Sequence, residues 1–305
     1  MSRTRYLILG ATGGPGLGVF LTLALQGRKA VGIGRTPAHV DAVNAMLKSR
    51  RLPGRAVAIN LKDHSRELDE LIAASDVLVS ATQPNFGTYC LSRPHALKRV
   101  VAVSSIRLYS RFFHPLIPLI DELRLAIEEG PVPGALVLTT MQAGGVGYNN
   151  LERLERLAQI SPVIPLPRSA AGALVQPVHT DDVVYCLLYC LARTPDAKVT
   201  TIGGPEQMTY GELVRRVGSS LGRQVWTPSV PDAALRWGAK LLKLVPGAPN
   251  ITAAELQRSA EDKICDIGSM FENFRRRPRA LDFRPQQAYP AALEAAWRAA
   301  EKGMN

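Results

Sequence analysis

Three glycines near the start of the chain have the spacing of a phosphate-binding turn. Gly10, Gly13 and Gly16 follow the apolar run LIL and open a predicted helix over residues 17–26. Backbone amides at a helix N-terminus are unpaired and lie at the positive end of the helix dipole, so such a turn can bind a pyrophosphate. Pro15 fits the first helical turn, where a missing amide N–H costs little. We predict a nucleotide-phosphate site here, and the alternative is a tight turn without a ligand.

The end of the second predicted strand, residues 29–34, indicates which dinucleotide this turn would bind. An acidic residue at this point hydrogen-bonds the ribose 2′-hydroxyl of NAD and repels the 2′-phosphate of NADP. The stretch VGIGRTP contains no carboxylate, and its Arg35 offers a guanidinium that can form two hydrogen bonds to a phosphate. The sequence therefore favours NADP, and the alternative for Arg35 is a solvated loop side chain.

The elements that must position this turn alternate regularly through the first half of the chain. Strands are predicted at residues 6–10, 29–34, 55–60, 76–81, 99–105 and 134–140, and helices at 17–26, 37–49, 64–74 and 89–97. Short, continuous apolar runs are typical of parallel strands that are buried on both faces. We predict an α/β fold with a Rossmann-type, doubly wound parallel sheet. Residues 1–143 would form the NADP-binding domain, and residues 144–305 would complete the sheet and form a smaller C-terminal substrate lobe.

Two helices are predicted in the second half of the chain from their capping residues. The segment TDDVVYCLLYCLA, residues 180–192, would be capped by Thr180 or Asp181 through a side-chain oxygen. In the segment 208–222, Thr209 and Glu212 have the spacing of a capping box.

Composition excludes several classes of protein. Of the 305 residues, 46% are hydrophobic and 21% charged, which is the balance of an ordinary globular protein. No apolar run reaches the roughly 20 residues of a membrane span, and no signal region precedes the first strand, so we expect a cytoplasmic protein without an integral membrane segment. The net charge is +11, but the basic residues are dispersed, so we expect no nucleic-acid partner. The four cysteines lack zinc-ligand spacing, and no metal is expected. A homodimer is left open.

Longer motifs resemble one family along nearly the whole chain. GATGGPG at 10–16, GRTP at 34–37, NLKD at 60–63, SAT at 80–82, VSSIRLY at 103–109, PVHTDDVV at 177–184 and GGPEQMTYGEL at 203–213 are similar to extended and atypical short-chain dehydrogenases/reductases, which are NAD(P)-dependent and epimerase/dehydratase-like. Within this family the chain most resembles the group that contains the NADPH-binding accessory subunit of respiratory complex I. The resemblance implies dinucleotide contacts from Gly10, Thr12, Gly13, Gly14, Pro15, Gly16, Arg35, Asn60, Leu61, Ala81, Thr82 and Ser104.

The family's catalytic pattern is only partly present. The family pairs a Ser or Thr with Tyr-x-x-x-Lys, in which the tyrosine exchanges a proton with the substrate oxygen and the lysine lowers its pKa. Ser105 has the position of the family's serine, but no tyrosine in the chain is followed four residues later by lysine. His114 aligns with the missing tyrosine, and because an imidazole titrates near neutrality, His114 is our candidate general acid/base. Tyr109 is the second candidate. The alternatives are a loop histidine without a role and a tyrosine that only packs.

The apolar stretches at residues 112–120 and 141–148 would lie near the cleft and favour a small hydrophobic carbonyl or enone as substrate. We therefore expect an NADP-dependent oxidoreductase. One alternative is a nucleotide-sugar epimerase or dehydratase, which normally relies on the missing Tyr and Lys. The other is a non-catalytic NADPH-binding protein with a structural or redox-sensing role. His179 lies in a family segment that is usually architectural.

Overall fold

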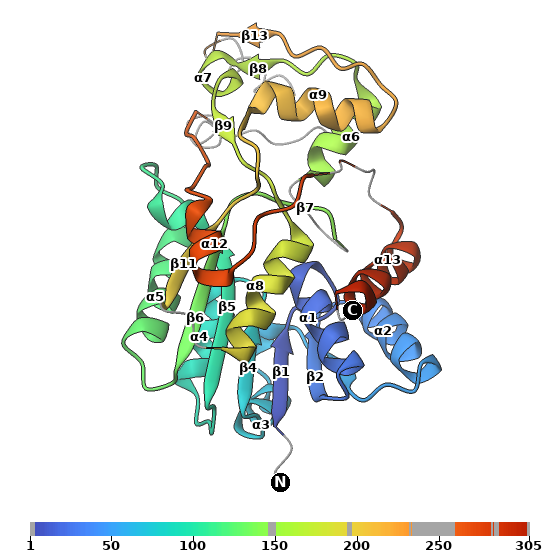
Figure 1. Ribbon diagram of the computed structural model, residues 1–305, viewed down its shortest axis with the longest axis vertical. Coiled ribbons are helices and arrows are strands. Elements are labelled where there is room, and N and C mark those ends of the chain that lie inside the picture. Colours follow the sequence, from blue (N-terminus) through green and yellow to red (C-terminus); the bar gives the residue numbers. More distant parts are fainter. Residues whose placement is uncertain are drawn as a thin grey trace.

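A seven-stranded parallel sheet forms the centre of the molecule (Figure 1). The computed structural model describes residues 4–145, 151–193, 197–231, 233, 260–281, 283 and 287–303. The strands are β1 (Arg5–Leu9), β2 (Lys29–Gly34), β3 (Arg55–Ala58), β4 (Val77–Ser80), β5 (Arg99–Ser105), β6 (Gly134–Thr139) and β11 (Val199–Ile202). They lie in the order β11-β6-β5-β4-β1-β2-β3, and every neighbouring pair is parallel. This confirms the predicted Rossmann-type sheet.

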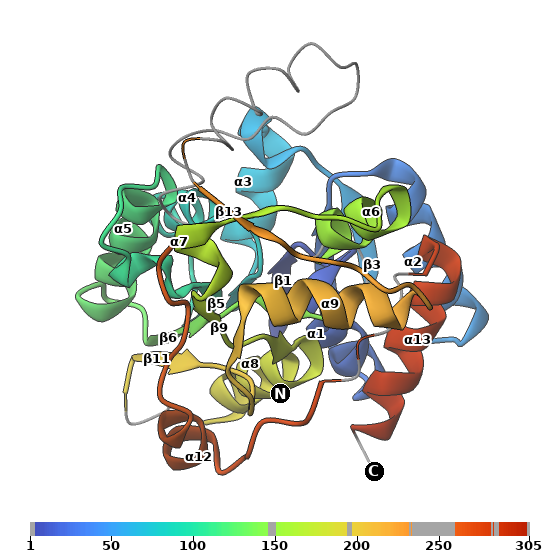
Figure 2. The ribbon, with the colours of Figure 1, turned by 90° about the horizontal axis from the view of Figure 1, so that it is seen from above.

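Helices cover both faces of the sheet, as Figure 2 shows. One face carries α1 (Gly14–Leu25), α2 (Pro37–Ser49), α8 (Thr180–Ala192), α12 (Gly268–Phe274) and α13 (Tyr289–Lys302), and the other carries α3 (Arg66–Ala73), α4 (Pro84–Ser92) and α5 (Leu116–Glu128). Each face of the sheet has its own hydrophobic core. Side chains alternate along each strand, so Ile8 and Val79 pack in the core on the α1 face, whereas Leu7 and Leu78 pack in the core on the α3 face. Burial on both faces explains the unbroken apolar runs of the strands.

The bounds of α4 differ from the prediction of a helix over residues 89–97. The helix begins at Pro84, whose fixed φ suits the first helical position, and it ends at Ser92. Arg93 precedes Pro94, and a residue before proline is disfavoured in the helical region, which explains the early end. The N-terminus of α4 therefore lies shortly after the carboxyl end of β4.

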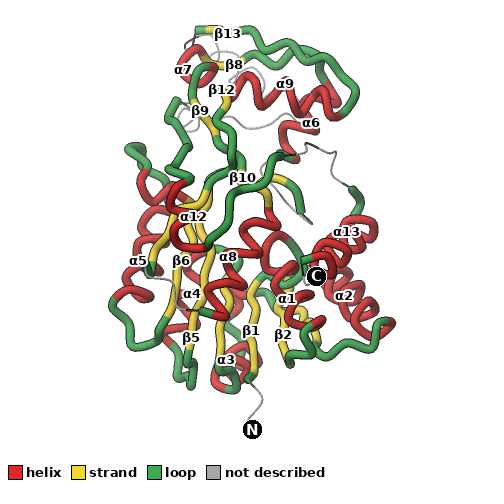
Figure 3. Tube along the Cα trace, in the orientation of Figure 1, coloured by secondary structure: helices red, strands yellow, loops and turns green. Residues whose placement is uncertain are grey.

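A smaller lobe lies beyond the carboxyl ends of the sheet strands (Figures 1 and 3). It contains α6 (Glu152–Ile160), β8 (Leu166–Pro167), α7 (Arg168–Ala171), β9 (Leu174–Val175), β12 (Met208–Thr209), α9 (Tyr210–Ser220) and β13 (Ser229–Val230). Leu154, Leu166, Val175 and Leu213 belong to its separate hydrophobic core. The Thr209 half of the predicted capping box is confirmed, because Thr209 Oγ1 accepts a hydrogen bond from the Glu212 amide at 3.1 Å, while the Glu212 carboxylate accepts from Arg216 Nε at 3.1 Å.

Two short strands, β7 (Gln142–Ala143) and β10 (Val178–His179), pair in parallel between the sheet and the smaller lobe. Between residues 4 and 303, no helix of the described segments combines the length and the apolar character that a membrane span requires.

Candidate functional site

The glycine-rich turn joins β1 to α1 at the carboxyl edge of the sheet. The amides of Gly10 and Ala11 donate to the Ile33 carbonyl at 3.0 and 2.9 Å, which ties the turn to β2. Gly10 has φ +84°, and a Cβ added there would lie 2.6 Å from the Ala81 carbonyl oxygen. A Cβ on Gly16 would lie 2.4 Å from the Gly10 carbonyl oxygen. Both positions therefore need glycine for close backbone packing.

The outer side of the same turn has the properties of an anion site. Gly13 is the N-cap of α1 and supplies no side-chain cap, so the first-turn amides have no intrahelical or capping acceptor. A Cβ on Gly14 would meet no heavy atom within 4 Å, so the space beside it is open. The buried Thr82 Oγ1 has no hydrogen-bond partner among the described residues. Uncapped amides, open space and an unpaired hydroxyl fit the phosphates and ribose of a dinucleotide.

The sheet places the predicted dinucleotide contacts at one edge, because the carboxyl ends of parallel strands lie together. Gly10, Thr12, Gly13, Gly14, Pro15 and Gly16 follow β1, Arg35 follows β2, Asn60 and Leu61 follow β3, Ala81 and Thr82 follow β4, and Ser104 is the last residue but one of β5. Two of these side chains are already engaged locally. Asn60 Oδ1 accepts from the Lys62 amide and its Nδ2 donates to Asp63, while Leu61 is buried in the core. For Leu61, a ligand contact would therefore involve the backbone.

Arg35 lies directly after β2, beside the turn. It is exposed, and within the described part of the chain it forms no ion pair. The preceding residue, Gly34, contacts Thr12 so closely that an added Cβ would lie 2.4 Å from the Thr12 methyl. The guanidinium is thus attached next to the glycine-rich turn, and no carboxylate of the described segments neutralises it.

The three catalytic candidates lie at the end of β5 and on the segment that follows it. Ser105 Oγ accepts from the Arg107 amide at 3.3 Å and caps a short 3₁₀ helix, Ile106–Tyr109. The Tyr109 side chain is exposed. His114 Nδ1 accepts from the Leu116 amide at 3.1 Å, at the start of α5. Because Nδ1 is the acceptor, a neutral His114 carries its proton on Nε2.

A residue that the sequence reasoning missed holds this segment. Glu261 accepts a hydrogen bond from Ser110 Oγ at 2.5 Å and another from the Arg111 amide at 2.7 Å. The partners are separated by about 150 positions in the sequence, and no motif relates them. Glu261 therefore connects the loop that carries the catalytic candidates to the segment that runs toward α12.

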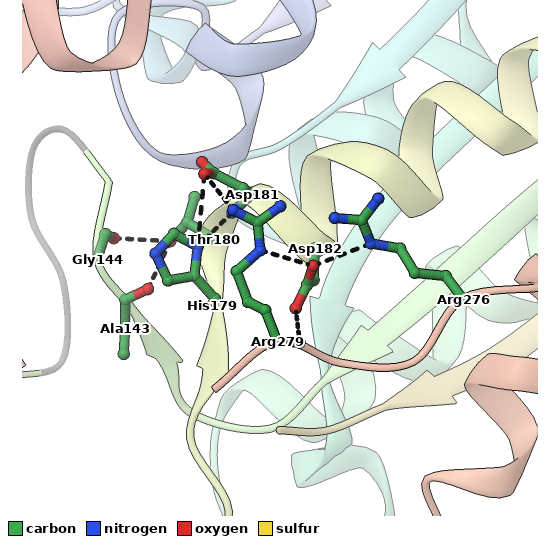
Figure 4. Close-up of polar contacts among 8 residues, drawn as sticks. All are labelled: Ala143, Gly144, His179, Thr180, Asp181, Asp182, Arg276 and Arg279. Carbon is green, nitrogen blue, oxygen red and sulfur yellow. Dashed lines mark hydrogen bonds and ion pairs between the residues drawn. The ribbon is translucent and has the colours of Figure 1, made fainter. Parts of the chain in front are cut away.

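An ionic cluster around one buried carboxylate lies where α8 begins, and Figure 4 shows it in close-up. Asp182 has no exposed surface. Its carboxylate accepts from Arg276 Nε at 3.1 Å, Arg279 Nε at 3.0 Å and the Arg279 amide at 2.8 Å. Arg279 also contacts Asp181 at 2.9 Å. The cluster attaches the C-terminal arginine-rich segment to α8. Its two carboxylates balance the charges of its two guanidinium groups.

His179, next to this cluster, is the N-cap of α8. Its Nδ1 accepts a hydrogen bond from the Asp181 amide at 3.1 Å. The predicted caps, Thr180 and Asp181, were therefore wrong, because a nitrogen of the His179 imidazole takes the role that we assigned to their side-chain oxygens. Thr180 Oγ1 instead donates to the carbonyl of Gly144 at 2.7 Å (Figure 4). Burial, followed by the charge of Arg279, lowers the pKa of His179, and Asp181 opposes the shift. These contacts give His179 an architectural role.

Comparison with known proteins supports the fold. No protein-family model matches the sequence, and no curated protein shows significant sequence similarity to it. Among solved structures, Citrobacter sp. triphenylmethane reductase complexed with NADP(H) is 15% identical, over 96% of this chain and 100% of that one, with a TM-score of 0.64. UDP-glucose 4-epimerase from Bifidobacterium longum, in complex with NAD⁺ and UDP, is 10% identical over 99% of both chains, with a TM-score of 0.63.

A third similar structure is dTDP-glucose 4,6-dehydratase from Bacillus anthracis in complex with NAD, which is 14% identical over 98% of this chain and 97% of that one, with a TM-score of 0.63. At these identities the comparisons show a shared fold. The chain therefore has, over almost its full length, the Rossmann-type fold of these reductase, epimerase and dehydratase structures.

Proposed function

We propose that this protein binds NADP(H) and is an atypical short-chain dehydrogenase/reductase that acts on a small hydrophobic carbonyl or enone. The observation that carries the proposal is the glycine-rich turn, with its uncapped helix N-terminus between β1 and β4. The order of the strands reverses here, because β2 lies beside β1 on one side and β4 lies beside it on the other. Open α/β sheets bind ligands in the crevice at such a reversal. Structures of similar fold contain NAD or NADP(H), which supports the same use of the turn here.

The preference for NADP over NAD is supported by Arg35. The exposed guanidinium follows β2, where the 2′-substituent of the adenosine ribose would lie. No acidic residue occupies the VGIGRTP stretch to repel a phosphate. Arg35 can bind a 2′-phosphate through two charge-assisted hydrogen bonds.

Replacing Arg35 with Asp is expected to weaken NADPH binding about tenfold while leaving NADH binding unchanged or tighter. The physical reason is that a carboxylate repels the 2′-phosphate and can accept from a 2′-hydroxyl. Calorimetric titration of both dinucleotides measures the change. Arg55→Asp is the matched control, because Arg55 is exposed at the opposite, amino end of β3 and its replacement alters the net charge equally. Equal NADPH affinities in both variants would contradict the role of Arg35.

A hydrophobic substrate is supported by exposed aromatic rings on the segment that carries the catalytic candidates. The side chains of Tyr109 and Phe113 are 62% and 76% exposed on the segment after β5. Reduction of a carbonyl to an alcohol consumes one hydride, which NADPH supplies when bound, and one proton. Tyr109 Oη and His114 Nε2 are our candidate proton donors, and Ser105 Oγ can hydrogen-bond the substrate oxygen.

A panel of hydrophobic ketones, aldehydes and enones tests catalysis. We expect NADPH oxidation with at least one member, and a fall in kcat of about a hundredfold in either Tyr109→Phe or His114→Gln, since a general acid contributes at least that much. The dissociation constant for NADPH should not change in the affected variant. Tight NADPH binding without turnover of any compound would instead support a structural or redox-sensing role. The missing Tyr-x-x-x-Lys pair favours that second function, as does the likeness to the group that contains the complex I accessory subunit.

A further inference from the structure

A side chain of the C-terminal helix contacts the glycine-rich turn. Tyr289, the first residue of α13, donates a hydrogen bond from its hydroxyl to the Thr12 carbonyl at 2.8 Å. Its ring stacks on the imidazole of His39 in α2, with the ring centroids 3.6 Å apart and the planes 2° from parallel. A residue 277 positions away thus contacts the backbone of the predicted phosphate site.

The rest of α13 is held by contacts that do not involve this hydroxyl. Glu294 accepts two hydrogen bonds from Arg50 Nη2 in the segment that ends α2, at 3.0 and 2.9 Å. The Arg50 guanidinium also lies 4.5 Å from the centre of the buried Trp297 ring. These contacts and the apolar side of α13 are sufficient to hold the helix in place. The hydrogen bond of the Tyr289 hydroxyl is therefore not needed to hold α13, and its effect falls on the turn.

The hydrogen bond fixes the orientation of one peptide group. In the trans peptide between Thr12 and Gly13, the carbonyl and the N–H point in opposite directions. The Gly13 N–H donates to the Gly10 carbonyl at 3.4 Å, a long and therefore weak bond, whereas the bond from Tyr289 is short. Glycines 13 and 14 follow directly and allow the backbone to rotate easily. Without Tyr289, rotation of this peptide could turn a carbonyl oxygen toward a bound phosphate.

Burial raises the pKa of Tyr289 to about 12, so the hydroxyl keeps its proton and remains a donor at neutral pH. We propose that Tyr289 is a positioning residue of the dinucleotide site, which holds the Thr12 carbonyl outward and so orders the turn before the ligand binds. The C-terminal helix is thereby part of the proposed site, and Tyr289 acts on it through the Thr12 carbonyl. This inference rests on the proposed NADP(H) binding.

Tyr289→Phe tests the inference because it keeps the ring, its stacking on His39 and the packing of α13, and removes only the donor. We expect the dissociation constant for NADPH to rise about three- to tenfold, as for the loss of one hydrogen bond. Amide hydrogen exchange of residues 12–16 should also become faster in the protein without dinucleotide. Tyr185→Phe is the matched control, because the Tyr185 hydroxyl donates to the Phe274 carbonyl at 3.3 Å, away from the turn.

In Tyr185→Phe, both the NADPH dissociation constant and the exchange of residues 12–16 should equal those of the wild type. Equal behaviour of Tyr289→Phe and the wild type in both measurements would overturn the inference, as would an equal loss of affinity in the two variants, which would indicate general destabilisation. If the wild type binds neither NADPH nor NADH, the proposed function fails, whereas faster exchange confined to Tyr289→Phe would still support the ordering of the turn.

Discussion

Replacing Gly10 with alanine is expected to lower the free energy of unfolding by about 3 to 4 kcal/mol and to abolish NADPH binding. A side chain at φ +84° costs about 1 to 2 kcal/mol. The added Cβ would also lie 2.6 Å from the Ala81 carbonyl oxygen, and because that oxygen belongs to the backbone, relief requires β1 and the turn after β4 to separate, at a further cost of about 2 kcal/mol. The turn would then no longer present its amides together.

Gly27→Ala is the matched control for Gly10→Ala. Gly27 also has a positive φ, +70°, but a Cβ there would meet no atom within 4 Å. The control therefore carries the cost of the backbone conformation without the collision, about 1 kcal/mol. Denaturant unfolding and NADPH titration measure both variants. If Gly10→Ala were no less stable than Gly27→Ala and bound NADPH normally, the close approach of the turn to Ala81 would not matter.

Asp182→Ala is expected to lower the free energy of unfolding by about 2 to 3 kcal/mol, because it removes a buried hydrogen-bonded carboxylate that Arg276 and Arg279 share, although Arg279 keeps its contact with Asp181. Asp182 is fully buried and accepts three hydrogen bonds, one of them from the Arg279 backbone. Its loss should loosen the attachment of the segment 276–279 to α8. Denaturant unfolding gives the change in stability, and limited proteolysis should show new cleavage at the arginines of this segment.

Glu70→Gln is the control for the Asp182 variant. The Arg66–Glu70 pair has a nitrogen–oxygen distance of 2.9 Å, but its side chains are 93% and 65% exposed. Water and salt screen such a surface pair, so its loss should have no measurable effect on unfolding. A similar stability of the two variants would show that burial does not strengthen the cluster at Asp182.

The sequence was sufficient to predict the central sheet and the position of the glycine-rich turn. Both depend on short-range patterns: apolar runs buried on two faces, and glycines directly between a strand and a helix. Since parallel strands end at the same edge, the order of the elements also placed Arg35, Thr82 and Ser105 near that turn. The cap at Thr209 was predictable for the same reason, because capping joins residues three positions apart.

The contacts that complete the site were decided by the tertiary structure alone. Tyr289 reaches Thr12, Glu261 reaches the loop after β5, and Asp182 pairs with two arginines, across separations of about 90 to 280 residues. In the sequence, Arg276 and Arg279 belong to a basic run, and Tyr289 stands outside every motif. Long-range pairs leave no periodic or local signal, because their partners are chosen by the packing of α8, α12 and α13 on the sheet rather than by neighbouring residues. Local spacing therefore determined the position of the proposed dinucleotide site, and packing determined which distant side chains contact the segments around it.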